Sequence, residues 1–263
     1  MPPRLGQHFL VNPRPIKIAI EALALTRYDT VIEIGPGRGA LTAPLSLAVE
    51  RAGAPLIVIE RDRELAKNLK GRFESGVEVV AGDALRELPM LLKRYGSHVK
   101  IAGNIPFYIT GKLLRILSEA PAPPERAVLL VQREVAKRII AKAPRFNLLA
   151  AAVQFWAEPK LLAMVPRSDF TPSPKVDSAL VLFERIALRS KEERERYYKA
   201  LRDIFRQPRK TVLNNVRQAT GVPREKMENL LRRLRFPPNI RPQNLSVDGI
   251  LRIAHAVEER GTG

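Results

Sequence analysis

Short apolar runs alternate with amphipathic stretches along the first 184 residues of the chain. Seven apolar runs predict strands, which lie at 30–34, 55–60, 77–80, 99–103, 127–131, 161–165 and 179–183. Between them, apolar positions spaced three and four residues apart predict helices near 15–25, 40–51, 62–73, 85–95, 110–118, 134–141 and 148–156. Strands that alternate with helices are typical of a parallel α/β sheet. The loop between the last two strands is too short for a crossover helix, so we expect these strands to pair antiparallel.

From residue 185 onward the pattern predicts helices alone, at 192–207, 210–219, 224–234 and 247–258, with Ser246 as an N-cap. We therefore expect two domains, an α/β domain at 1–184 and a small all-α domain at 185–263. The second domain carries 19 basic and 9 acidic side chains. Its net positive charge per residue is about three times that of the first domain, and the pattern is typical of a small helical domain packed on an α/β catalytic domain.

The composition narrows the class of protein. The 263 residues carry a formal net charge of +18, which favours nucleic acid as the partner, with an acidic partner or a merely basic surface as alternatives. The absence of cysteine excludes disulfide and thiolate chemistry, and three dispersed histidines argue against a zinc site. We therefore expect no metal. No run has the length of a membrane span and no signal peptide begins the chain, so we expect a soluble, cytoplasmic protein. High arginine and proline content favours a thermophilic source.

Three alternating glycines follow the first predicted strand, in the run VIEIGPGRG (31–39). Glycines permit positive φ angles and close approach of a ligand, and the following helix offers free N–H groups. The spacing GxGxG differs from the dinucleotide pattern GxGxxG, although a structural turn or a nicotinamide site remains an alternative for this run alone. Glu33, which precedes the first glycine by two residues, suits a ligand with an ammonium group.

Carboxylates follow the next two predicted strands. Glu60 ends the second strand, where it can accept both hydroxyls of a ribose. Asp83 follows the third strand, where it can accept from the amine of an adenine. Together with the glycine turn, these residues predict a pocket for S-adenosylmethionine, an adenosine that carries an amino acid.

The run NIPF (104–107) follows the fourth predicted strand, at the edge where open α/β sheets bind ligands. The Asn104 oxygen and the Ile105 carbonyl, held in place by Pro106, can accept both hydrogens of an adenine N6 amine. Phe107 can stack on the base. This arrangement aims the nitrogen lone pair at a methyl group, so catalysis would come from positioning in a dry site. A helix start capped by Asn104 is the alternative for this run alone.

Six motifs in this order resemble the small-subunit ribosomal RNA adenine N6,N6-dimethyltransferases. The motifs are GQHFL (6–10), EIGPGRGALT (33–42), VIERD (58–62), GDAL (82–85), GNIPFYIT (103–110) and FTPSPKVDSA (170–179), with RPQNLS (241–246) in the tail. The resemblance implies a Rossmann-like class I methyltransferase with a seven-stranded, mostly parallel sheet and a small all-α C-terminal domain. It also implies methyl transfer from S-adenosylmethionine to two adjacent adenosines in a hairpin near the 3′ end of small-subunit rRNA, within a pre-ribosomal particle.

By position, the resemblance also implies which residues form the site. The catalytic residues would be Asn104, Ile105, Pro106 and Phe107, and the cofactor contacts would be His8, Leu10, Gly35, Glu60, Asp83 and Asn104, joined by Gly37 of the glycine turn. Phe170 would be a second aromatic face on a flipped adenine, with a core residue under a Pro-rich loop as the alternative. Phe107 stands where the family usually has Tyr, so the stacking face is kept without the hydroxyl.

The basic tail would grip the rRNA backbone by shape and charge. The candidates act as a group, with a solvated helix face as the alternative for each: Arg206, Arg209, Lys210, Arg232, Arg233 and Arg235. Two other functions remain open, a large-subunit rRNA adenine N6-methyltransferase of the antibiotic-resistance type and a non-catalytic RNA-binding assembly factor. The presence of Glu60, Asp83 and Asn104 argues against the second. We expect a monomer.

Overall fold

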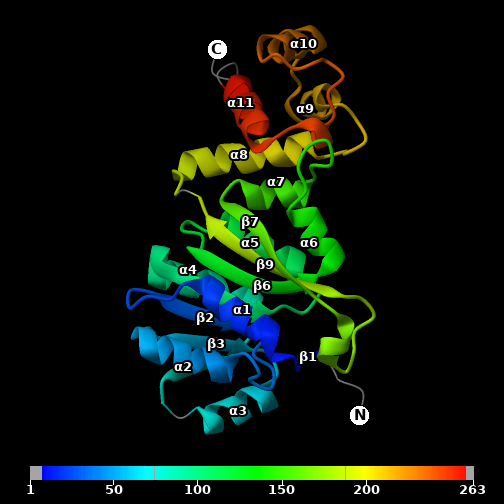
Figure 1. Cartoon of the computed structure of the whole chain (residues 1–263). Helices are drawn as coiled ribbons and strands as arrows, with labels where there is room; N and C mark the ends of the chain where they lie inside the picture. The colour runs from blue at the N-terminus through cyan, green and yellow to red at the C-terminus, as the bar shows by residue number, and fades with distance from the viewer. Residues whose placement is uncertain (1–7, 74, 187, 259–263) are drawn as a thin grey trace. The chain divides into compact units, whose positions relative to one another are not determined.

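The computed structural model describes residues 8–73, 75–186 and 188–258, which fall into two compact units (Figure 1). The first unit holds Met1–Lys137 and Trp156–Leu188, and the second holds Arg138–Phe155 and Arg189–Gly263. The first two residues of the GQHFL motif lie outside the described residues. Within the described ranges, no helix is long and apolar enough to cross a membrane.

A seven-stranded sheet forms the centre of the first unit. Its strands are β2 (Thr30–Ile34), β3 (Leu56–Glu60), β4 (Val77–Ala81), β5 (Val99–Asn104), β6 (Arg126–Gln132), β7 (Ala157–Val165) and β9 (Ser178–Arg185). They lie in the order β4-β3-β2-β5-β6-β9-β7, and β9 runs antiparallel to both neighbours while the first five strands are parallel. The seven predicted strands and the antiparallel pairing of the last two are thereby confirmed.

Helices cover both faces of this sheet (Figure 1). One face carries α1 (Pro13–Leu23), α2 (Thr42–Ala52) and α3 (Arg63–Arg72), which share one apolar cluster with the sheet. The other face carries α4 (Ala84–Tyr95) and α5 (Thr110–Glu119), which contact each other. Right-handed crossovers that run in opposite directions along a sheet place their helices on opposite faces, which explains this division.

A second, two-stranded sheet was not predicted from the sequence. It pairs β1 (Phe9–Leu10) with β8 (Phe170–Thr171) in antiparallel register. A strand of two residues is too short to show an alternating pattern. The pairing fixes the start of the described chain to the loop that precedes β9.

The second unit is helical. It packs α7 (Leu148–Gln154), α8 (Lys191–Ile204), α9 (Val212–Thr220), α10 (Arg224–Arg233) and α11 (Val247–Glu258) around one apolar cluster. Helix α6 (Arg133–Ile139) runs across the division, and short 3₁₀ turns occupy Gly96–His98, Arg167–Asp169 and Pro242–Asn244. Ser246 caps α11 as predicted, because its Oγ accepts from the Gly249 amide at 3.1 Å.

The segment 138–155 belongs to this helical unit, whereas the expected boundary at residue 184 assigned it to the first domain. The reason is packing. Phe155 stacks on the buried Tyr197 with ring centroids 3.8 Å apart, and the Tyr197 hydroxyl donates to the Ala151 carbonyl at 2.9 Å. The helical pattern of 148–156 indicates an apolar face but does not say which partner covers it.

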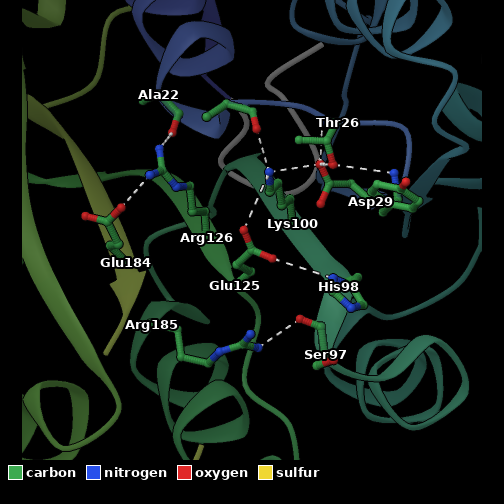
Figure 2. A network of polar contacts seen from close by, with 12 residues as sticks. Ala22, Thr26, Asp29, Ser97, His98, Lys100, Glu125, Arg126, Glu184 and Arg185 are labelled. Carbon is green, nitrogen blue, oxygen red and sulfur yellow. Dashed lines mark hydrogen bonds and ion pairs between the residues drawn. The ribbon is translucent and has the colours of Figure 1, made fainter. Parts of the chain in front are cut away.

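A buried lysine lies near the amino ends of the parallel strands (Figure 2). Lys100 of β5 is 1% exposed, and its Nζ lies 2.8 Å from Asp29 Oδ2 and 3.8 Å from Glu125 Oε1. The ammonium also donates to the Ala24 carbonyl at 2.6 Å. Burial alone would raise the pKa of Asp29, but hydrogen bonds from Lys100 and Thr26 outweigh it and leave that pKa below its ordinary value.

Two arginines, Arg126 and Arg185, also bind polar groups at this edge of the sheet (Figure 2). Arg126 bonds the Glu184 carboxylate and donates to the Ala22 carbonyl, while Arg185 donates to the carbonyls of Ser97 and Pro123 at 2.8 Å. The amino edge of the sheet is therefore an internally satisfied polar network.

We predict that Lys100→Met destabilises the protein by about 3–5 kcal/mol at pH 7, because Asp29 would be left buried without its cation. The double variant Asp29→Asn/Lys100→Met should recover part of that loss. Since the pKa of Asp29 is lowered in the folded state, its contribution is present above the unfolded pKa and is lost as the pH falls through the folded pKa. Urea unfolding from pH 7 to pH 2 measures both effects. Equal losses for the single and double variants would contradict the pairing.

Candidate active site

A cavity lies at the opposite edge of the sheet, where β2 and β5 end side by side. The strand order reverses between these two strands, and such a switch point is where open α/β sheets bind ligands. Ten of the predicted site residues line this cavity: His8, Leu10, Gly35, Gly37, Glu60, Asn104, Ile105, Pro106, Phe107 and Phe170.

The glycine turn forms one wall of the cavity. Gly35 and Gly37 have φ angles of +68° and +56°, which side chains disfavour. A Cβ on Gly37 would lie 2.9 Å from Cε1 of Phe9, so the backbone here is bare and close to its surroundings. A side chain at Gly37 would therefore collide with the Phe9 ring, which packs against the bare backbone of the turn.

Glu60 is held in a fixed position at the end of β3. Its two carboxylate oxygens accept from backbone amides, Oε2 from Gly37 at 3.0 Å and Oε1 from Asp62 at 2.9 Å. Each oxygen keeps a further lone pair, because a carboxylate offers about four acceptor sites. The side chain is 5% exposed and lines the cavity, so it can accept hydroxyl donors from a ligand.

Glu33 of β2 is the least satisfied group in this cavity. It is 1% exposed, and its Oε2 has no hydrogen-bond partner among the described residues. The pKa of Glu33 is raised to about 8, mainly by burial; the Thr42 hydroxyl opposes the rise, and the nearby Glu60 adds to it. A buried carboxyl without a partner offers a site for a positively charged ligand group.

The NIPF run brings Asn104 and Phe107 to the same cavity. The Asn104 side-chain nitrogen donates to the His8 carbonyl at 2.9 Å, which leaves its oxygen as an acceptor. The Ile105 amide donates to the Leu130 carbonyl at 3.2 Å. Phe107 is half-buried, and its ring centroid lies 6.3 Å from that of His8. Helix α5 begins only at Thr110, so Asn104 does not cap it.

The two-stranded sheet closes the cavity from the other side. Leu10 pairs with Phe170, and the His8 Nδ1 donates to the Pro172 carbonyl at 2.8 Å. Phe170 is 4% exposed; it lines the cavity and also belongs to the apolar cluster of the first unit. The structure therefore places Phe170 both as a core residue and as a cavity wall.

The structure does not bring every candidate residue to this cavity. Asp83 does not line it, and its Oδ1 caps α4 by accepting from the Leu85 amide at 3.0 Å. The basic candidates lie exposed in the second unit: Arg206, Arg209, Lys210, Arg232, Arg233 and Arg235.

Sequence reasoning missed Phe9, which lines the cavity between His8 and Leu10 and lies under the Arg38 guanidinium at 4.5 Å. Its position inside the HFL run was the available signal. Among the described residues, no group of three His, Cys, Asp or Glu is placed to hold a metal ion.

These features define a Rossmann-like methyltransferase: the order of the strands, the antiparallel strand β9, and the glycine turn that lines the cavity. Two solved structures support the class. A dimethyladenosine transferase from Plasmodium falciparum has a TM-score of 0.78 and 26% identity, and covers 97% of this chain and 98% of its own. The 23S rRNA methyltransferase ErmE has a TM-score of 0.72 and 26% identity, with coverages of 95% and 99%.

The sequence comparisons identify the family. The model for ribosomal RNA adenine dimethylase matches residues 2–259. Two relatives carry the name ribosomal RNA small subunit methyltransferase A. The protein from Dehalococcoides mccartyi is 36% identical over 93% of this chain and 84% of its own length, and that from Acidobacterium capsulatum is 35% identical over 98% and 92%. The chain belongs to the ribosomal RNA adenine dimethylase family.

We predict that Glu33→Gln stabilises the free protein at pH 8–9, by roughly 3–5 kcal/mol. The pKa of Glu33 is raised from 4.5 in the unfolded chain to about 8 in the folded protein. Its carboxylate therefore costs stability progressively as the pH rises through that range, and an amide has no such cost. Urea midpoints at pH 5, 7 and 9 measure the difference. A Glu33→Gln effect that is independent of pH would contradict the raised pKa.

Proposed function

We propose that this protein transfers methyl groups from S-adenosylmethionine to N6 of two adjacent adenosines in a hairpin near the 3′ end of small-subunit rRNA. The product would be N6,N6-dimethyladenosine. The names of the curated relatives support the small subunit as the target. The proposal includes action as a monomer in the cytoplasm on a pre-ribosomal particle, and the thermophilic source stays a prediction.

The residues of the cavity fit S-adenosylmethionine. The unpartnered Oε2 of Glu33 suits the ammonium of an amino acid, and the lone pairs of Glu60 suit ribose hydroxyls. Gly35 and Gly37 line the cavity without side chains that would occupy it. Asp83 would use its second oxygen for the adenine amine while the first caps α4. When bound, S-adenosylmethionine supplies an electrophilic methyl group on a sulfonium, which is an excellent leaving group.

His8 and Leu10 would close the methionine end of this site. Both residues line the cavity; the pairing of β1 with β8 holds Leu10 there, and the bond to the Pro172 carbonyl holds His8. The His8 carbonyl also fixes Asn104. The same short strand thus shapes the cofactor site and the target site.

The orientation of Asn104 is the observation that carries the proposal. Because its amide nitrogen is bonded to the His8 carbonyl, its oxygen is left to accept from the adenine N6 amine. The Ile105 carbonyl would be the second acceptor, with Pro106 limiting the backbone motion. Two such bonds direct the nitrogen lone pair away from the ring, and the amine loses its proton to water after transfer. Phe107 and Phe170 line the same cavity and would hold the faces of the flipped base.

The second unit would bind the RNA backbone. Its exposed candidates form a group whose charge suits phosphate oxygens: Arg206, Arg209, Lys210, Arg232 and Arg233. Recognition of folded RNA by backbone and shape is typical of such surfaces. The affinity for rRNA should therefore fall steeply with salt.

The first test is methylation of immature small subunits with tritiated S-adenosylmethionine. We expect N6,N6-dimethyladenosine in small-subunit rRNA from the wild type and at least a 100-fold lower rate from Asn104→Ala, since the target amine would lose its acceptor. Nucleoside analysis identifies the product. Large subunits assayed in parallel provide the control. Label confined to the large subunit, or none in either subunit, would overturn the proposal.

The affinity for S-adenosylmethionine should rise with pH. Glu33 has to lose its proton to hold an ammonium group, and its pKa is about 8. The dissociation constant should therefore fall by close to tenfold per pH unit between pH 6 and pH 7 and level off above pH 8. Isothermal titration calorimetry in two buffers of different ionisation enthalpy measures the released proton. Glu33→Gln should bind more weakly and without this pH dependence, and a wild-type constant that is flat from pH 6 to pH 9 would exclude the coupling.

A further inference from the structure

Two residues beside the cavity contact each other outside it. Arg61 follows Glu60 at the end of β3, and Tyr108 follows Phe107 after β5. The Arg61 Nη1 donates to the Tyr108 hydroxyl at 3.2 Å. Since β3 and β5 flank β2 in the sheet, this contact joins the loops on either side of the glycine turn.

We propose that Arg61 and Tyr108 form a binding site for the nucleotide that flanks the target adenosine in the RNA. Tyr108 stacks on the base of that nucleotide, and Arg61 pairs with its phosphate. This inference rests on the proposed function, because it assumes that an adenine of an RNA chain enters the cavity.

The exposure of Tyr108 supports the stacking role. Its side chain is 58% exposed, although the adjacent Phe107 turns into the cavity. The two Cα atoms are separated by about 3.8 Å, as in any trans peptide. A base that neighbours the flipped adenine stays at the mouth of the cavity, where Tyr108 is the aromatic face beside Phe107. Stacking of single-stranded bases on such faces is a general mode of RNA binding.

The charge of Arg61 supports the phosphate role. No carboxylate among the described residues forms an ion pair with Arg61, and its bond to a neutral hydroxyl leaves the positive charge uncompensated. A planar guanidinium matches phosphate oxygens with two parallel N–H bonds. The bond to Tyr108 is exposed and contributes little to stability, so RNA can replace it at small cost.

A strap that covers the cofactor is the other role for such a bridge. A strap of that kind would form part of the cavity wall. Neither Arg61 nor Tyr108 lines the cavity, whereas their chain neighbours Glu60 and Phe107 do. The affinity for S-adenosylmethionine measured without RNA distinguishes the two roles, because only a strap over the cofactor would change it.

The chain contains a matched control. Arg27 donates to the Tyr28 hydroxyl, and its guanidinium lies 4.8 Å from the centre of the Tyr28 ring. Tyr28 is 67% exposed and precedes β2, at the edge of the sheet opposite the cavity. An exposed Arg–Tyr pair is thus present where the proposal expects no RNA.

The experiment compares Tyr108→Ala, Tyr108→Phe, Arg61→Ala and the control Tyr28→Ala. For each, kcat/KM is measured with unmethylated small subunits, and the Kd for S-adenosylmethionine is measured by calorimetry without RNA. Tyr108→Ala should lower kcat/KM roughly 5- to 100-fold. Tyr108→Phe should stay within about threefold of the wild type because the stacking face is kept. Arg61→Ala should lower kcat/KM. It should also reduce the slope of log(kcat/KM) against log salt concentration by about one, as expected for the loss of one phosphate contact.

The Kd for S-adenosylmethionine and the Tyr28→Ala rate should both stay at wild-type values. An unchanged kcat/KM for Tyr108→Ala would overturn the site. A Kd for S-adenosylmethionine that rises by the same factor as kcat/KM falls would also overturn it, in favour of a strap over the cofactor. If the wild type methylates no small subunits, the proposed function itself is overturned. If the wild type and Tyr108→Ala are equally active, only the proposed nucleotide site is overturned.

Discussion

The close approach of β2 and β5 is the constraint on which the cavity depends. A Cβ on Gly103 would lie 2.6 Å from the Ile34 carbonyl oxygen, and one on Gly35 would lie 3.3 Å from that of Asn104. Gly103 and Ile34 are direct partners in the parallel register. Because neither glycine carries a side chain, Asn104 leaves its strand beside the glycine turn. A side chain at Gly103 would force the strands apart and separate Asn104 from the turn.

Two buried carboxyl groups at opposite ends of β2 show how one strand serves both stability and binding. Asp29 has a lysine partner and a lowered pKa, whereas Glu33 has an unpartnered oxygen and a raised pKa. The first stabilises the fold at neutral pH. The second costs stability, which is typical of groups that a ligand completes. One edge of the sheet therefore contributes to stability through Asp29, and the opposite edge contributes to binding through Glu33.

Much of the fold could be predicted from the sequence, because most strands of the large sheet contain a short apolar run that is followed by a helix or loop. Those strands place Glu60 and Asn104 at one edge by topology alone. The β1–β8 pairing could not be predicted, since it joins two-residue strands more than 150 residues apart. Asp83 shows a second limit: its spacing does not reveal that one of its carboxylate oxygens caps α4. Likewise, the Arg61–Tyr108 contact joins two loops 47 residues apart, and only the folded backbone brings them together.

The β1–β8 pairing also has a consequence for the order of events during translation. His8 is synthesised early, but the Pro172 carbonyl to which it donates follows 164 residues later. Until that partner has left the exit tunnel, the short strand has nothing to pair with, and the wall that carries Phe9 and Leu10 is missing. A nascent chain therefore acquires the complete cavity only after most of the first unit has emerged. Competence to bind a ligand there is gained late in synthesis, together with the completion of the sheet.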